Sequence, residues 1–155
     1  MPETIKSAWG IIYYISKEDK QPRFFLIKRH AFSGKIERVA PKWKIEQNEQ
    51  PQQTVIREIS EETQIKPQNL KVQSNLWKII INLHNKEKED YNKEIIYYLV
   101  EYSGDFSDIN IENIEWYLWY HKWASIQEIS GLIYYENFRN ILMKAYNEIT
   151  KNQKH

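Results

Sequence analysis

The pattern of hydrophobic and polar positions changes its period several times along the chain. Runs rich in β-branched and aromatic residues at 7–15 and 23–29 predict two strands, and the polar segment between them predicts a hairpin turn. Residues 30–50 contain glycine and proline but few sustained apolar repeats. We therefore expect a loop there, with one short strand near residues 36–40.

A helical period begins at Pro51, a residue that suits the first turn of a helix. Val55, Ile56 and Ile59 recur at helical spacing and place three apolar side chains on one face. The pattern therefore predicts a helix over residues 51–63, with this face packed inward.

The second half of the chain predicts three more strands and two more helices. The strand-like segments are residues 72–83, 94–102 and 116–123, joined by a charged loop at 85–93 and a polar loop at 103–114. Ser125 and Glu128 form a capping-box signal for a short helix. A final helix over 134–150 carries one apolar stripe: Phe138, Ile141, Leu142, Ala145 and Ile149. We expect one α/β domain spanning residues 1–155.

Composition and charge exclude several classes of function. The 22 basic and 21 acidic residues give a net charge of +1, so no global field favours nucleic acid or a membrane surface. The chain has no cysteine, which excludes a disulfide framework, a thiolate zinc site and a cysteine nucleophile. The four histidines show no metal-ligand spacing. With no signal-peptide pattern and no membrane-spanning run, we expect a cytoplasmic protein.

Three glutamates form the main candidate for chemistry. Glu58, Glu61 and Glu62 stand at i, i+3 and i+4, so their carboxylates share one helix face and repel one another. Hard divalent cations that bridge to phosphate take such oxygen ligands. Glu49 and Arg57 also suit an ion pair between the preceding loop and this helix. Taken alone, a glutamate cluster more often forms a solvated face.

The stretch PKWKIEQNEQPQQTVIREISEETQI resembles the Nudix box. Seven residues match that motif in register: Glu49, Arg57, Glu58, Ile59, Glu61, Glu62 and Ile65. The tail KWASIQEISGLIYYENFRNILMKA is similar to the same family. The resemblance implies a Nudix-like α/β/α sandwich with a mixed central sheet, and a pyrophosphohydrolase.

The chain departs from the family where glycines are expected. Trp43 replaces the first glycine of the box, Gln64 replaces the second, and Asn48 replaces a glycine often found before the first glutamate. The family glycine at the Trp43 position supplies a carbonyl near the metal, and this carbonyl survives the substitution. The indole is also a candidate for stacking on a base. A non-glycine residue with positive φ at Gln64 costs on the order of 1 kcal/mol.

The resemblance also implies roles for individual residues. Glu58, Glu61 and Glu62 would hold Mg²⁺ or Mn²⁺, and one of them would orient or deprotonate the attacking water. Arg57 would be a further catalytic residue, and Glu49 would have a supporting role. The candidate substrate-binding residues are Arg23, Lys28, Arg29, Trp43, Glu112 and Glu115. For the basic residues and the two glutamates, a solvated surface position is the alternative. The aromatic run at 116–123 is either a stacking platform or core.

The expected reaction is metal-dependent hydrolysis of a phosphoanhydride bond in a nucleoside diphosphate-linked small molecule. The segments SAWGIIYY and LIYYENFRNILMKA favour dinucleoside polyphosphates or nucleoside triphosphates as substrates. The alternative is a catalytically degenerate Nudix domain that binds a nucleotide or regulates, since Trp43 and Gln64 depart from the box. The sequence leaves open whether the protein is a monomer or a homodimer.

Overall fold

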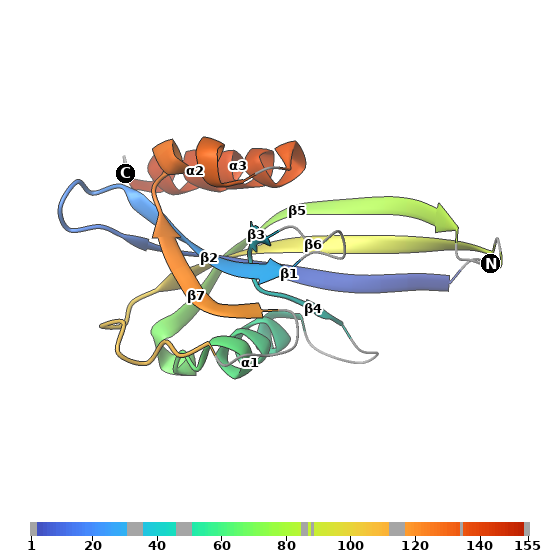
Figure 1. Cartoon of the computed structure of the whole chain (residues 1–155), viewed down its shortest axis with the longest axis horizontal. Helices are drawn as coiled ribbons and strands as arrows, with labels where there is room; N and C mark the ends of the chain where they lie inside the picture. Colours follow the sequence, from blue (N-terminus) through green and yellow to red (C-terminus); the bar gives the residue numbers. More distant parts are fainter. Residues whose placement is uncertain are drawn as a thin grey trace.

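The computed structural model describes residues 3–30, 36–45, 51–84, 87, 89–111, 117–133 and 135–153; within these ranges, the side chains of residues 3, 29–30, 51 and 117–120 are not described. A mixed sheet forms the central layer. Helix α1 covers one face of the sheet, and α2 and α3 cover the other (Figure 1). The expected α/β/α sandwich is confirmed.

The described elements alternate along the chain much as the hydrophobic pattern predicts. The strands are β1 (Glu3–Ile15), β2 (Pro22–His30), β3 (Ile36–Val39), β4 (Lys42–Lys44), β5 (Leu70–His84), β6 (Asp90–Tyr102) and β7 (Tyr117–Ala124). The helices are α1 (Pro51–Thr63), α2 (Ile126–Leu132), α3 (Glu136–Gln153) and a 3-10 turn, η1 (Pro67–Asn69).

The seven strands form one sheet in the order β3-β2-β1-β6-β5, with β4 paired to β1 and β7 paired to β2. Strands β1 and β6 run parallel, in register from Glu3 opposite Tyr91 to Tyr13 opposite Glu101. The other pairs are antiparallel. The sheet is therefore mixed, as the family resemblance implies.

Two loops are shorter in the structure than the sequence pattern predicts. The segment 30–50 contains β4 as well as the expected short strand, because Trp43 pairs with Ala8 of β1. Three residues are too few to carry a recognisable strand period. The charged loop expected at 85–93 is also partly wrong, since β6 begins at Asp90 and the amide of Asn82 donates to Asn92 across the two strands.

Helix α1 lies directly on the backbone of β1. Val55 and Ile59 are fully buried and Ile56 is half-buried, as expected for the inward face. A Cβ atom on Gly10 would lie 2.8 Å from Cδ1 of Ile59, so a larger residue there would require the Ile59 side chain to shift. On the opposite face, α3 buries the five predicted residues: Phe138, Ile141, Leu142, Ala145 and Ile149.

Local hydrogen bonds define the ends of two helices. The capping box that starts α2 is confirmed, because Ser125 Oγ accepts from the backbone N–H of Glu128 while the Glu128 carboxylate accepts from the backbone N–H of Ser125. At the end of α1, Gln64 has φ of 66°, the left-handed conformation expected there. Ser60 Oγ donates to the carbonyl of Ile65, 2.6 Å away, and holds this turn closed.

We expect Gln64→Gly to raise the free energy of unfolding by about 1 kcal/mol, because glycine adopts positive φ without steric cost. Gln64→Ala is the matched control, since alanine keeps the Cβ and hence the strain. Urea denaturation of the three proteins measures the difference. Equal stabilities for the glycine and alanine variants would contradict the strain at this position.

Candidate active site

The three glutamates of the box lie on the second half of α1 in different environments. Glu61 is exposed, with 60% of its side chain accessible, whereas Glu58 and Glu62 are half-buried. Their spacing places them on one side of the helix, next to the buried stripe of Val55 and Ile59. The site is therefore a carboxylate row that begins in solvent and ends against the core.

Arg57 supplies part of the positive charge that this row requires. Its guanidinium lies 3.3 Å from Oε1 of Glu58 and 3.2 Å from Oε1 of Glu61. These ion pairs reduce the repulsion between neighbouring carboxylates and hold two of them in place. The expected partner Glu49 lies outside the described residues, so its pairing with Arg57 stays a prediction.

Glu62 is the most perturbed of the three. Its Oε2 is buried and has no hydrogen-bond partner within the described part of the chain. Burial, followed by the charges of Glu58 and Glu61, raises the pKa of Glu62 to about 8, and the charge of Lys42 opposes this rise. A carboxyl group with a pKa near neutrality is suited to accept or donate a proton.

The same features test whether these residues suit a divalent cation. Among the described residues, three or more His, Asp or Glu side chains nowhere converge into a ready-made cation site. The row nevertheless presents oxygen donors to a hard cation, and the Oε2 of Glu62 has no other partner within the described ranges. The donor set therefore fits a hard divalent cation such as Mg²⁺ or Mn²⁺.

Trp43 is placed differently from the stacking residue that we expected. Its side chain is only 8% exposed, and its Cη2 lies 3.6 Å from the position of a Cβ atom on Gly10. A ring buried between β1 and α1 presents no free face to a base, so its burial argues against the stacking role. The role of its backbone carbonyl stays a prediction.

Two of the basic candidates, Arg23 and Lys28, lie on β2. Arg23 pairs with Asp19 at 2.8 Å in the turn between β1 and β2. Lys28 is half-buried on β2, opposite Arg38 of β3. The side chain of Arg29 and both late-loop glutamates, Glu112 and Glu115, lie outside the described residues. Their proposed contacts with substrate stay predictions.

The aromatic run before α2 is partly core. Trp123 packs against four rings, with centroid distances of 4.9 Å to Tyr14, 5.0 Å to Phe25, 5.6 Å to Tyr102 and 5.7 Å to Phe106. This confirms the core alternative for Trp123. The side chains of residues 116–120 lie outside the described part, so a stacking platform there is neither supported nor excluded.

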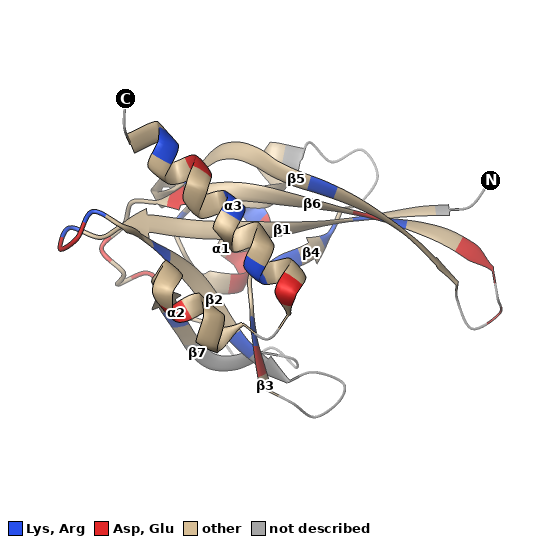
Figure 2. Ribbon diagram, turned by 90° about the horizontal axis from the view of Figure 1, so that it is seen from above, with Lys and Arg blue, Asp and Glu red and all other residues tan. Residues whose placement is uncertain are grey.

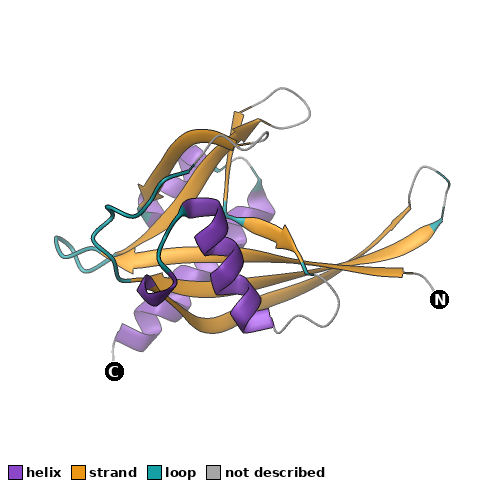
Figure 3. Cartoon of the chain, turned by 90° about the horizontal axis from the view of Figure 1, so that it is seen from below, coloured by secondary structure: helices purple, strands orange, loops and turns teal. Residues whose placement is uncertain are grey.

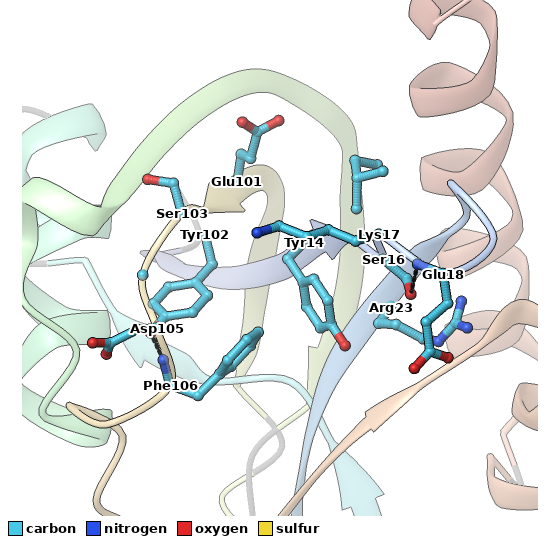
Figure 4. Close-up of a pocket in the computed structure, with 12 residues that line it drawn as sticks. Tyr14, Ser16, Lys17, Glu18, Arg23, Glu101, Tyr102, Ser103, Asp105 and Phe106 are labelled. Atoms are coloured by element: carbon cyan, nitrogen blue, oxygen red, sulfur yellow. Dashed lines mark hydrogen bonds between the residues drawn. The ribbon is translucent and has the colours of Figure 1, made fainter.

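A pocket of about 720 Å³ opens between the β1–β2 turn and the segment after β6 (Figure 4). Phe106 and Tyr14 face each other in it at a ring distance of 4.9 Å. The backbone N–H of Phe106 donates to the hydroxyl of Tyr102 and holds Phe106 at φ of 72°. None of the lining residues belongs to α1, so this pocket is separate from the carboxylate row.

Sequence reasoning missed this pocket and the influence of Lys42 on Glu62. The pocket forms because the end of β1 lies beside the end of β6, and residues so far apart in sequence give no local signal. Lys42 belongs to the unexpected strand β4. No periodic pattern marks either feature.

Comparison with known proteins places the chain in a family. The family model described as NUDIX domain matches residues 6–144. A search of curated protein sequences gives no match. The chain therefore belongs to the NUDIX family, as its glutamate box indicates.

Solved structures share the fold at low sequence identity. C. elegans Ap4A hydrolase in a binary complex aligns with a TM-score of 0.71 and 20% identity, over 95% of this chain and 98% of that one. The NUDIX domain of Shewanella oneidensis NrtR, complexed with ADP ribose, gives 0.66 and 16%, over 96% and 90%. The MutT protein from Methanosarcina mazei gives 0.63 and 19%, over 95% and 96%. Family and fold together support the expected class, a Nudix-type pyrophosphohydrolase.

We expect Trp43→Ala to lower the free energy of unfolding by about 3–5 kcal/mol, because a buried aromatic side chain leaves a cavity when it is removed. Trp77→Ala is the matched control, since Trp77 is 43% exposed and should cost much less. Urea denaturation measures both losses. A Trp43→Ala loss no larger than that of the control would contradict the buried position of the indole.

We expect the stability of the protein without divalent cations to fall as pH rises from about 4.5 to about 8 because of Glu62. In this window the folded protein retains a proton that the unfolded chain has lost, so unfolding becomes easier with increasing pH. Glu62→Gln should remove this component, whereas Glu136→Gln on α3 should keep it. Urea denaturation across the pH range, with a chelator present, measures the slopes. Identical slopes for wild type and Glu62→Gln would show that the carboxyl group titrates normally.

Proposed function

We propose that this protein hydrolyses a phosphoanhydride bond in a nucleoside diphosphate-linked small molecule, with Mg²⁺ or Mn²⁺ bound at the carboxylate row of α1. The observation that carries the proposal is the environment of Glu62, a buried carboxyl group with an unpartnered oxygen and a pKa of about 8, beside Glu58 and Glu61. A purely solvated glutamate face would have neither feature. Membership of the NUDIX family supports the same chemistry.

The residues of the carboxylate row and Arg57 would have different roles in this reaction. Glu58, Glu61 and Glu62 would hold the cation, which neutralises phosphate charge and stabilises the leaving phosphate. Water attacks phosphorus, one bridging P–O bond breaks, and the water proton passes to a carboxylate. Glu62 is our candidate for this acceptor, because one of its carboxylate oxygens has no hydrogen-bond partner among the described residues and it stands on the same helix face as Glu58 and Glu61. Arg57 positions Glu58 and Glu61 through its two ion pairs.

Dinucleoside polyphosphates and nucleoside triphosphates are the favoured substrates. This preference rests on the two ends of the sequence and is supported by the similarity to C. elegans Ap4A hydrolase, which extends over nearly the full length of both chains. ADP ribose, the ligand of the NrtR NUDIX domain, is a further nucleoside diphosphate-linked compound to test.

The proposed setting is the cytoplasm, where small-molecule nucleotides would be the partners of the protein. No helix in the described part of the chain is long and apolar enough to cross a membrane. The near-neutral net charge gives no reason to expect nucleic acid as a partner.

Binding without hydrolysis is the second candidate function. It is favoured by the ion pairs of Arg57, which occupy Glu58 and Glu61 in the described structure. In that case a nucleotide would bind without turnover, and Glu58 and Glu61 would stay paired with Arg57.

We expect the wild type to release phosphate or nucleotide from at least one polyphosphate when Mg²⁺ or Mn²⁺ is present. Glu62→Gln should lower turnover by about a hundredfold or more, because it removes one negative charge and a proton acceptor. Glu136→Gln is the control, since this exposed glutamate lies at the start of α3. A panel of nucleoside triphosphates, dinucleoside polyphosphates and ADP ribose provides the substrates.

Calorimetric titration separates the possible outcomes of this assay. Cation binding by the wild type and weaker binding by Glu58→Gln support the metal site. Nucleotide binding without turnover on any member of the panel would favour the binding module. A wild type that binds no cation, with or without nucleotide, would overturn the metal-dependent mechanism.

A further inference from the structure

The hairpin of β5 and β6 extends the sheet beyond the helices. In Figures 1 and 3 its two strands run past the ends of α1 and α3, together with the first part of β1. Helix α3 still reaches β5 at Trp77, where Nζ of Lys144 lies 4.0 Å from the ring centroid. The view in Figure 2 shows the far end of the hairpin with no helix over it.

Strand β5 is also a terminal strand of the sheet, and no other strand of the described part pairs with its outer edge. Two register shifts, between Val72 and Ser74 and between Asn75 and Trp77, distort the first half of this edge. Such bulges discourage pairing with another strand. From Trp77 to His84 the register is unbroken, so this second half of β5 presents a straight edge.

The straight segment lacks the other common protections of an edge strand. It contains no proline, and its one lysine, Lys78, has its ammonium 3.0 Å from Oε1 of Glu94 on the neighbouring strand. Its apolar side chains are unusually exposed: 43% for Trp77, 64% for Ile80 and 37% for Ile81. A long, straight, apolar edge of this kind requires a cover to stay soluble.

We propose that the segment 77–83 of β5 pairs antiparallel with the same segment of a second copy of the chain, about a two-fold axis at Ile80. This pairing makes the two sheets continuous and satisfies backbone N–H and C=O groups along both edges. An isologous contact of this kind closes on itself as a dimer and covers the bulge-free half of the β5 edge in both copies.

The sequence of the segment is complementary to itself in this register. On the face that carries Trp77, each copy places Trp77 opposite Leu83 and Ile79 opposite Ile81, so all four pairs across the axis are apolar. On the other face, Ile80 meets its own counterpart and Lys78 lies opposite Asn82. Like charges nowhere stand opposite each other, which distinguishes a second copy from an arbitrary partner strand.

The pairing is tested by the oligomeric state of three proteins in sedimentation velocity, measured over a concentration series. The wild type should be a dimer. Ile80→Lys should be a monomer, because two ammonium groups would meet at the axis, and its fold should survive since Glu94 lies opposite in β6. Ile36→Lys is the matched control: Ile36 is 56% exposed on β3, the strand at the other end of the sheet, and this variant should stay dimeric.

Circular dichroism of each variant checks that it is folded before its mass is interpreted. The chain has no cysteine, so Ile80→Cys introduces a single thiol, and oxidation should link two copies, whereas Ile36→Cys should stay unlinked. A monomeric wild type throughout the series would overturn the proposal. So would a dimer that survives Ile80→Lys, or one that dissociates on Ile36→Lys instead.

Discussion

The packing of Ile59 over Gly10 of β1 determines how closely the glutamate helix α1 approaches the sheet. A Cβ atom at residue 10 would lie 2.8 Å from Cδ1 of Ile59, so the Ile59 side chain would have to shift to make room for it. Glu58 and Glu62 lie one residue before and three residues after Ile59 on the same helix. The burial of Glu62, and with it the raised pKa of that carboxyl group, therefore depends on how closely α1 approaches the sheet.

Trp43 stands where the resemblance to the Nudix box places a glycine. Its indole lies beside the space above Gly10, and its side chain is almost wholly buried. The added bulk becomes part of the core between sheet and helix. In the described structure, the tryptophan at this position therefore affects the packing of the core.

Sequence reasoning succeeded where structure is local. The helical period of Val55 and Ile59 predicted α1, and the Ser125–Glu128 pair predicted the start of α2, because the interactions that form these features span only a few residues. Similarly, the spacing of the three glutamates was sufficient to place them on one helix face.

The missing features all depend on contacts between distant segments. The burial of Trp43 follows from the pairing of the short strand β4 with β1, which three residues do not reveal. Strands β5 and β6 extend further than expected because polar residues such as Asn82 and Asn92 bond across the hairpin. Glu61 is exposed and Glu62 is half-buried because of the way α1 packs against the sheet. The hydrophobic periodicity of the sequence does not distinguish these two environments.

The parallel pairing of β1 with β6 has a consequence for the order in which the chain folds. The hydroxyl of Tyr13 donates to Glu101, a contact that spans 88 positions, and the register along both strands has the same separation. The centre of the sheet cannot form until a loop of this length has closed, so the topology has a high contact order and favours slow folding. During synthesis, the first strand and the glutamate helix leave the ribosome well before the strand that completes the sheet beside them. The apolar residues of β1 therefore remain without their partner strand for that interval, which is when the nascent chain is most exposed to aggregation.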